Sequence, residues 1–330
     1  MILVGLVLIG LMLVANFAVG SARTAARSDL RIDSVDVVPL EQSGAQVAMP
    51  VIPPAPSIGV IRPGTATTPR RYTVDPVFSA EIQSFLRHQK GTYGVAVAGL
   101  NSGVSALVNG NEQFATASLY KLFLMYEVMR QVEVGVLSLD DTVTTAANYT
   151  FIEGEGGIPA DTEVTIDEAL RTMIGASSNA GALALLDLVG PAALNNVPSR
   201  LGLQNTELAA RPSGNEPGHY FVDGVTTATD LMTFFVALDA GHLVGPGGDA
   251  RMQDILLGQR IRDRLPTLLP REARVAHKTG DLDHSVHDVG IVYLPRHRFV
   301  IVVLSRDVPY DDSKAVIAEL SRSAHEWITR

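Results

Sequence analysis

The sequence has no cysteine among its 330 residues, and lysine is scarce. The lack of cysteine excludes disulfide bonds, thiolate metal ligands and a thiol nucleophile. The lysines are Lys90, Lys121, Lys278 and Lys314. The formal net charge of −9 suits neither nucleic acid nor an anionic surface, and we expect no nucleic-acid partner. A chain of this length with 46% hydrophobic residues is sufficient for one sizeable core with appendages.

A long apolar run and a proline-rich stretch divide the chain into three parts. Residues 1–20 are almost wholly apolar, and about twenty helical residues span the roughly 30 Å hydrocarbon core of a bilayer. This segment is predicted to be a transmembrane signal anchor, with a cleaved signal peptide as the alternative. Residues 21–76 are predicted to be an extended linker, because their prolines break helices and central strands. Residues 77–330 are predicted to form the folded domain.

Within this domain, strand patterns lie near both ends and helix patterns lie in the middle. The expected strands are 94–100, 104–108, 275–279, 286–293 and 299–304, followed by a final helix at 311–327. Thr165 and Glu168 form a capping box at the start of one internal helix. We therefore expect a sheet lobe from residues 77–115 and 272–330, and a helical lobe from residues 116–271.

One Ser-x-x-Lys motif, Ser118 to Lys121, opens a long apolar segment that is predicted to be helical to about Val132. Residues three apart lie on one face of a helix, so the lysine amine can reach the serine hydroxyl. Serine is a poor nucleophile without an adjacent base, and a lysine can serve when burial or a second cation lowers its pKa. Apolar residues of this helix occupy most of its circumference, which favours burial of the lysine.

Two further motifs follow in order along the chain. Ser177-Ser178-Asn179 comes after an apolar helical segment, and Lys278-Thr279-Gly280 lies in a segment of strand character. The ordered set Ser-x-x-Lys, Ser-x-Asn and Lys-Thr-Gly resembles that of the class A β-lactamases and penicillin-binding proteins. The resemblance covers roughly residues 77–330. It implies an α/β (α+β) fold of the β-lactamase/transpeptidase type, with an antiparallel sheet flanked by helices, an all-helical lobe, and a site in the crevice between the lobes.

The resemblance also implies roles for the motif residues. Ser118 would be the acylated nucleophile and Lys121 its base or proton relay. Ser177 would carry the proton to the leaving nitrogen, and Asn179 would bind the substrate amide. Neither a cofactor nor a metal is implied.

The Lys-Thr-Gly strand would form the opposite wall of the site. Lys278 and Thr279 would bind the substrate carboxylate, with Gly280 beside them. The charge of Lys278 would help to depress the pKa of Lys121. The backbone N–H of Asp281 would form an oxyanion hole together with that of the nucleophile.

Two positions depart from the family pattern near the substrate. Ser178 stands where the family has an aspartate, and we expect modest structural consequences. Val289 stands where the family has a strand arginine. Carboxylate binding then depends more on Lys278 and Thr279, and His287 is a further candidate.

A third departure concerns the water that hydrolyses the acyl-enzyme. In class A β-lactamases a glutamate on an Ω-loop activates this water, and an ungapped alignment places Pro212 at its position. Glu216 lies about four residues later and is the candidate replacement. Arg211 and Asp223 are expected to close the neck of this loop as an ion pair.

Other site chemistries fit the sequence less well. A zinc site would draw on His277, His284, His287 and Asp288, but residues on strands alternate between faces. The glycine-rich run from Glu153 to Gly157 lacks the Lys-Ser/Thr of a phosphate-binding loop.

The predicted function is the opening of β-lactam amides through an acyl-enzyme at Ser118. The alternatives are a penicillin-binding peptidase or transpeptidase acting on D-alanyl peptides of the cell wall, and a non-catalytic sensing module. We expect a monomer.

The predicted location follows from this chemistry. Arg23, Arg27 and Arg31 follow the apolar segment, and the positive-inside rule alone would place them in the cytoplasm. Cell-wall chemistry requires the opposite orientation, and we give the motifs precedence. We expect a single-pass protein of the cell membrane with its catalytic domain outside the cytoplasm, or a secreted protein if the segment is cleaved.

Overall fold

The computed structural model describes residues 72–147, 153–214 and 218–330. The predicted anchor, nearly all of the linker and Glu216 lie outside the described residues. Within those ranges, no single helix is long and apolar enough to cross a membrane. One sharply bent pair of helices, 179–189 with 191–201, meets the limits of length and composition only when taken together.

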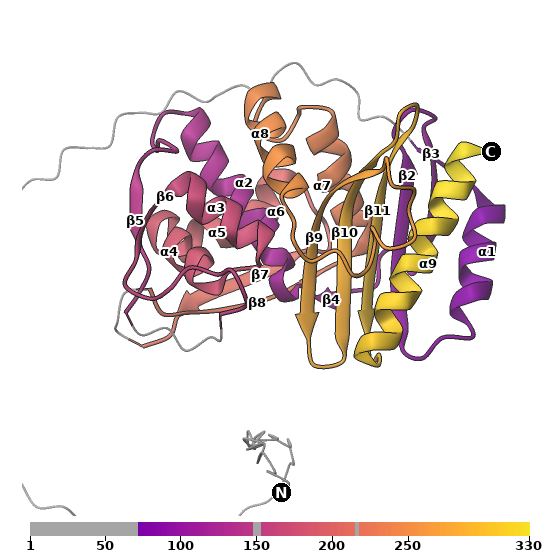
Figure 1. Ribbon diagram of the computed structural model, residues 1–330, viewed down its shortest axis with the longest axis horizontal. Helices are drawn as coiled ribbons and strands as arrows, with labels where there is room; N and C mark the ends of the chain where they lie inside the picture. The colour runs from indigo at the N-terminus through magenta and orange to yellow at the C-terminus, as the bar shows by residue number, and fades with distance from the viewer. Residues whose placement is uncertain (1–71, 148–152, 215–217) are drawn as a thin grey trace, which may run out of the picture. The chain divides into compact units, whose positions relative to one another are not determined.

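A six-stranded sheet lies at the centre of the sheet lobe, in the order β1-β3-β2-β11-β10-β9 (Figure 1). Its strands are β1 (Thr73–Val74), β2 (Thr92–Gly99), β3 (Val104–Val108), β9 (Arg274–Leu282), β10 (Ser285–Tyr293) and β11 (Arg298–Arg306). All neighbours are antiparallel except β1 and β3. The N-terminal hairpin therefore joins the C-terminal strands, as the sequence predicts.

Two helices cover one face of this sheet, α1 (Pro76–Leu86) and α9 (Tyr310–Thr329) (Figure 1). Phe78 stacks on Trp327 with ring centroids 4.6 Å apart. Asp75 caps α1 and also accepts a hydrogen bond of 2.9 Å from Trp327 Nε1. Residues 73–75, predicted as the end of the linker, therefore belong to the folded domain, because a strand pairing and a helix cap both depend on them.

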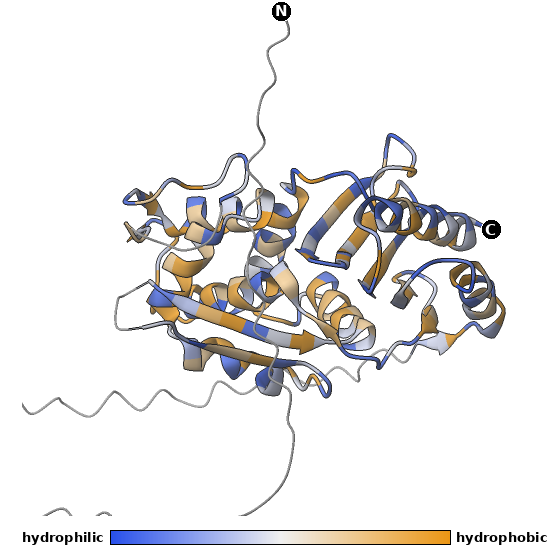
Figure 2. Cartoon of the chain, turned by 90° about the horizontal axis from the view of Figure 1, so that it is seen from below, coloured by the Kyte–Doolittle hydropathy of each residue, from blue (hydrophilic) through white to orange (hydrophobic). Residues whose placement is uncertain are grey.

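The helical lobe contains four longer helices around the buried helix α2 (Tyr120–Glu133). These are α3 (Ile166–Gly175), α4 (Asn179–Val189), α7 (Ala228–Asp239) and α8 (Pro246–Leu257), with the short α5 (Pro191–Asn195) and α6 (Val197–Leu201). Every residue of α2 from Lys121 to Met129 is buried, as its apolar pattern predicts. The capping box of Thr165 and Glu168 begins α3. Figure 2 shows hydrophobic residues concentrated on strands and helices, while many loops are hydrophilic.

The helical lobe is not wholly helical, which corrects the prediction. β4 (Phe114–Ala115), β8 (Tyr220–Thr226) and β7 (Glu207–Pro212) form a three-stranded sheet, and β5 (Thr142–Thr144) pairs with β6 (Glu163–Thr165). In β7, Leu208 and Ala210 are buried while their neighbours are exposed, which is the two-residue alternation of a strand. A β-hairpin therefore stands where the resemblance implies an Ω-loop.

Candidate active site

Ser118 lies in a single 3₁₀ turn, η1 (Ala117–Leu119), directly before α2. Ala117 has φ of 46°, in the left-handed region that residues with a side chain rarely occupy. Directly before this turn, the N–H of Thr116 donates a hydrogen bond of 2.9 Å to the carbonyl of Gly224 on β8. Such a strained conformation persists only where surrounding contacts hold it, and it is common at functional sites.

This turn opens onto a cleft of about 270 Å³ between the two lobes. The residues lining it include Ser118 and Tyr120, Asn179 and Leu183 of α4, Asp281 and Leu282 of β9, and Tyr220 to Gly224 of β8 except Phe221. The cleft thus brings together Ser118 and Asn179 of the first two motifs and Asp281, the residue that follows the Lys-Thr-Gly motif, which are far apart along the chain.

Lys121 is fully buried one helical turn after Ser118. Its Nζ donates to the carbonyl of Ser177 at 2.7 Å and to Oδ1 of Asn179 at 2.8 Å. Burial lowers the pKa of Lys121 well below its ordinary value, and the charge of Lys278 lowers it further, while Glu153 opposes the shift. The site therefore favours the neutral amine, which is the form that can accept a proton.

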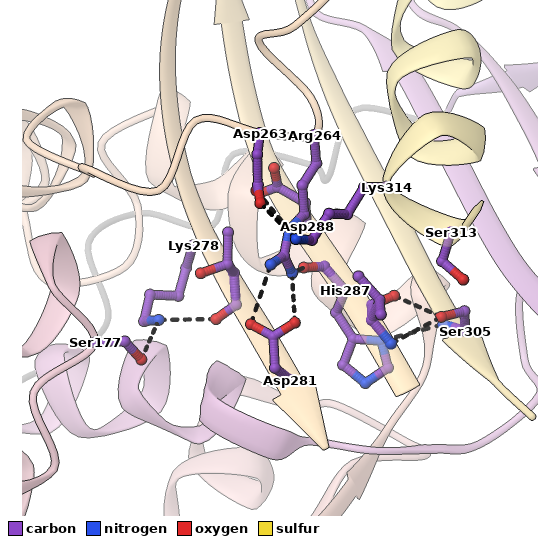
Figure 3. A network of polar contacts seen from close by, with 12 residues as sticks. Ser177, Asp263, Arg264, Lys278, Asp281, His287, Asp288, Ser305, Ser313 and Lys314 are labelled. Carbon is purple, nitrogen blue, oxygen red and sulfur yellow. Dashed lines mark hydrogen bonds and ion pairs between the residues drawn. The ribbon is translucent and has the colours of Figure 1, made fainter. Parts of the chain in front are cut away.

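Ser177 joins the two lysines at the turn between α3 and α4. Its Oγ lies 3.3 Å from Lys121 Nζ. The same Oγ lies 2.9 Å from Lys278 Nζ (Figure 3). The backbone of Ser177 is also left-handed, with φ of 55°. A single hydroxyl in contact with both amines can relay a proton between them and a ligand in the cleft.

Lys278 reaches this hydroxyl from β9 and is itself fully buried. Burial lowers its pKa to about 7, although Asp281 and Asp288 act in the opposite direction. The neighbouring Thr279 hydroxyl is buried and has no hydrogen-bond partner within the described ranges. A buried hydroxyl without a partner is costly, so a substrate acceptor here would remove a penalty.

Gly280 allows β9 to approach the turn of the nucleophile. A Cβ at this position would lie 3.2 Å from Cγ of Leu119 and 3.3 Å from Cβ of Ala117. These contacts are tighter than ordinary van der Waals separations. The glycine of the Lys-Thr-Gly motif thus serves the close packing of the strand against η1.

Arg264 is a site residue that the sequence reasoning missed. It is almost fully buried, and its guanidinium pairs with both carboxylate oxygens of Asp281, at 2.8 and 3.2 Å (Figure 3). It also donates to the carbonyl of His287 at 3.0 Å. Arg264 therefore holds the end of β9 beside the cleft. It comes from the connection between α8 and β9, where nothing in the local pattern distinguishes it from other arginines.

His287 does not face the substrate, which corrects its candidacy as a carboxylate ligand. Its Nε2 donates to the carbonyl of Ala115 at 3.0 Å, and its Nδ1 accepts from the N–H of Ser305 at 3.1 Å. Burial lowers its pKa to about 4, so the ring is neutral. Both ring nitrogens are occupied by backbone partners, and the side chain joins β10 to β4 and β11.

The residues of the weaker zinc hypothesis are not assembled into a metal site. His277 Nδ1 pairs with Asp288 at 2.7 Å inside the sheet, while His284 is exposed at the β9–β10 turn. Among the described residues, no group of three histidine, aspartate or glutamate side chains is placed to hold a metal ion.

The hairpin β7–β8 occupies the segment predicted to be an Ω-loop. The ungapped alignment equates Pro212 with the family's water-activating glutamate. Pro212 is exposed at the end of β7 and does not line the cleft, so this alignment does not identify the residue that meets the acyl-enzyme. The predicted ion pair of Arg211 and Asp223 is present, at 3.1 Å, across the hairpin. Tyr220, which lines the cleft, donates its hydroxyl to Asp187 of α4.

Glu153 is the second residue that the sequence reasoning missed. Its carboxylate accepts hydrogen bonds from Ser178 and from the backbone of Asn179 at the start of α4. The sequence showed only that its glycine-rich run is not a phosphate loop. Which helix this run would meet depends on the tertiary fold.

Residues 77–328 match the profile of the beta-lactamase enzyme family. The chain belongs to this family. The extended-spectrum β-lactamase PER-1 of Pseudomonas aeruginosa is 26% identical over 278 residues, covering 76% of this chain and 87% of that protein. The predicted superfamily is thereby confirmed.

Solved structures share the fold. The structure of PBP-A is 26% identical with a TM-score of 0.68, covering 78% of this chain and 98% of that chain. A β-lactamase from Sphaerobacter thermophilus is also 26% identical with a TM-score of 0.68, covering 77% of this chain and 98% of that chain. The mixed α/β fold expected for the β-lactamase family is therefore confirmed, with the hairpin β7–β8 as a local feature.

The low pKa of Lys278 predicts a pH-dependent stability. Above about pH 7 the folded state releases a proton that the unfolded state keeps to about pH 10.4, so the free energy of unfolding rises with pH. We expect Lys278→Met to reduce this slope by up to about 1.4 kcal/mol per pH unit. Urea unfolding between about pH 7 and 9 measures the slope.

Lys314 provides the control for this measurement. Burial lowers its pKa, but the hydrogen bond with Asp263 and the charges of Asp263 and Tyr310 together raise the pKa overall. Lys314→Met should therefore leave the slope in this range unchanged. Identical slopes in the wild type and Lys278→Met would show that Lys278 keeps an ordinary pKa.

Proposed function

We propose that this protein is a class A β-lactamase-type serine hydrolase that opens β-lactam amides through an acyl-enzyme at Ser118. One observation carries the proposal. Lys121, buried and shifted toward its neutral form, lies on the turn after Ser118 and contacts the same hydroxyl of Ser177 as Lys278 does. A nucleophile at the cleft is thus followed by a buried base that contacts a proton relay.

Acylation begins when the neutral amine of Lys121 takes the proton of Ser118 as its Oγ attacks the β-lactam carbonyl. The carbonyl oxygen becomes negative, and the N–H groups of Ser118 and Asp281, both at the cleft, stabilise it. Ser177 then passes a proton to the departing lactam nitrogen, and Lys121 restores that proton to Ser177. The C–N bond breaks, and an ester to Ser118 remains.

The strand β9 binds the carboxylate that penicillins carry. Protonated Lys278 supplies the charge, and Thr279 supplies a hydroxyl that has no other partner within the described ranges. Asn179 binds the amide of the substrate side chain from the opposite wall. Arg264 contributes indirectly, because its ion pair fixes Asp281 next to these groups.

The next step, hydrolysis of the ester, has weaker support in the cleft. Among the described residues that line it, only Asp223 and Asp281 carry carboxylates, and each is paired with an arginine. Among the described residues that line the cleft, there is therefore no carboxylate without an arginine partner that could act as the general base. Glu216 is proposed as the residue that activates water if the ester is hydrolysed quickly.

This same observation favours a second function, a penicillin-binding enzyme acting on D-alanyl peptides of the cell wall. Such an enzyme shares the acylation chemistry but retains the β-lactam adduct. An acyl-enzyme complex with penicillin G is described for a mutant of PBP-A that is 25% identical to this chain. The D-alanyl-D-alanine carboxypeptidase DacF of Bacillus subtilis is 27% identical, but only over 34% of this chain and 31% of that protein, which supports this function weakly.

We also propose that residues 1–20 anchor the protein in the cell membrane with the catalytic domain outside the cytoplasm. The apolar composition and length of this segment support the anchor.

Replacing the nucleophile tests the acylation step. We expect Ser118→Ala to abolish covalent labelling by a fluorescent penicillin while the thermal unfolding midpoint stays nearly unchanged, because the hydroxyl is needed only for chemistry. Ser102→Ala, at an exposed turn, is the matched control and should label like the wild type. Labelling of Ser118→Ala at another serine would refute the assignment.

Burst kinetics on a chromogenic cephalosporin test the hydrolysis step. We expect a stoichiometric burst followed by slow turnover, since a positioned general base typically contributes about 10²–10⁴-fold. Glu216→Gln should leave both phases unchanged. Fast linear hydrolysis that becomes a burst in Glu216→Gln would instead make Glu216 the base and favour the β-lactamase over the penicillin-binding enzyme.

A further inference from the structure

The N-terminus of α4 receives a carboxylate from a distant loop. The first N–H groups of a helix have no partner within the helix and require one from outside. Ser178 caps the N–H of Gly181 at 3.0 Å. Glu153 accepts from the N–H of Asn179 at 2.7 Å and from that of Ala180 at 3.3 Å, and it also accepts from the hydroxyl of Ser178. Serine and glutamate together satisfy the whole first turn.

The glycine-rich run is shaped to hold Glu153 in this place. A Cβ at Gly157 would lie 2.5 Å from Cγ and from Oε1 of Glu153, so only glycine leaves room for the side chain. The N–H of Gly157 donates to the carbonyl of Gly154 at 3.0 Å, which closes the turn. Gly156 is left-handed with φ of 76°, and its carbonyl accepts from Arg260 at 3.4 Å. The run therefore holds the Glu153 carboxylate against the first N–H groups of α4.

The residues next to this cap are those that the reaction uses. Ser177 precedes the cap in a left-handed conformation that needs external support. The two shortest hydrogen bonds of Lys121 go to Ser177 and Asn179, on either side of Ser178. A shift of this turn would therefore displace the partners of Lys121 and the relay hydroxyl together.

We propose that Glu153 is a positioning residue that supplies, from another segment of the chain, the carboxylate that position 178 lacks. The family pattern has an aspartate at this position of the middle motif, whereas this chain has Ser178 and brings Glu153 to its hydroxyl. Glu153 holds the turn of Ser177 and Asn179 in the geometry that acylation needs. This inference rests on the proposed function, because acylation at Ser118 is the step that the turn serves.

Exchanging the carboxylate between the two positions tests the proposal. The measured quantity is the second-order rate constant for acylation by benzylpenicillin. Glu153→Gln should lower it by about tenfold or more, since small displacements of catalytic groups have effects of this order. Ser178→Asp should also lower it, because two carboxylates would then face each other at one helix end. The double variant of Glu153→Gln with Ser178→Asp should recover most of the wild-type rate, since an aspartate at the cap position can accept from the N–H groups of Ala180 and Gly181.

Glu155→Gln is the matched control, because Glu155 lies in the same run but is exposed. It should acylate at the wild-type rate. A double variant no faster than Glu153→Gln would overturn the proposal, and so would Glu153→Gln acylating like the wild type. If Glu153→Gln fails to fold, a double variant that folds and is acylated supports the exchange, and one that fails as well refutes it.

A second measurement separates this inference from the proposed function. Hydrogen exchange of the Asn179 and Ala180 amides should be faster in Glu153→Gln, and exchange of the Ala180 amide should return toward the wild-type rate in the double variant. Unchanged exchange would contradict the positioning role. If the wild type itself does not react with benzylpenicillin, the proposed function fails, while the exchange rates still decide whether Glu153 holds this turn.

Discussion

Burial of the Lys121 amine is the constraint on which the rest of the site depends. A charged ammonium in a protein interior loses its hydration, and such groups often become neutral instead. The contacts around Lys121 hold that amine in place, through the carbonyl of Ser177 and the amide of Asn179. These contacts require the left-handed turn of Ser177 and the capped start of α4. The reactivity of Ser118 is therefore a property of the packed core and of the turn that meets it.

The second lysine connects this arrangement to the sheet. Lys278 comes from β9 in the sheet lobe and bonds to Ser177 of the helical lobe at 2.9 Å. Gly280 lets the same strand lie against the turn of the nucleophile, and the ion pair of buried Arg264 with the partly exposed Asp281 holds the end of the strand. The contact of Lys278 with Ser177 thus joins the two walls of the cleft, and the same two residues take part in the proposed chemistry.

Much of this structure could be predicted from local sequence patterns. The terminal strands, the helix after Ser118 and the capping box at Thr165 depend on short-range periodicity and on caps, and the structure confirms them. The hairpin β7–β8 was missed because a family alignment was preferred to the alternation around Leu208. Glu153 and Arg264 were missed because each acts across a long loop closure, on a helix end or strand that only the tertiary fold brings near. His287 was misassigned because strand alternation does not reveal which backbone groups a ring will meet.

The small number of lysines allows a direct test of the central claim, that Lys121 is held as a neutral amine. Protein labelled with ¹³C at the lysine ε-carbon contains only the four lysine positions of the sequence, and Lys121→Arg and Lys278→Arg variants assign the two buried ones. A pH titration by NMR then reports the pKa of each. We predict that Lys121 titrates far below the ordinary value of about 10.4, and that Lys278 titrates near pH 7. A Lys121 signal that titrates at or above the ordinary value would contradict the account.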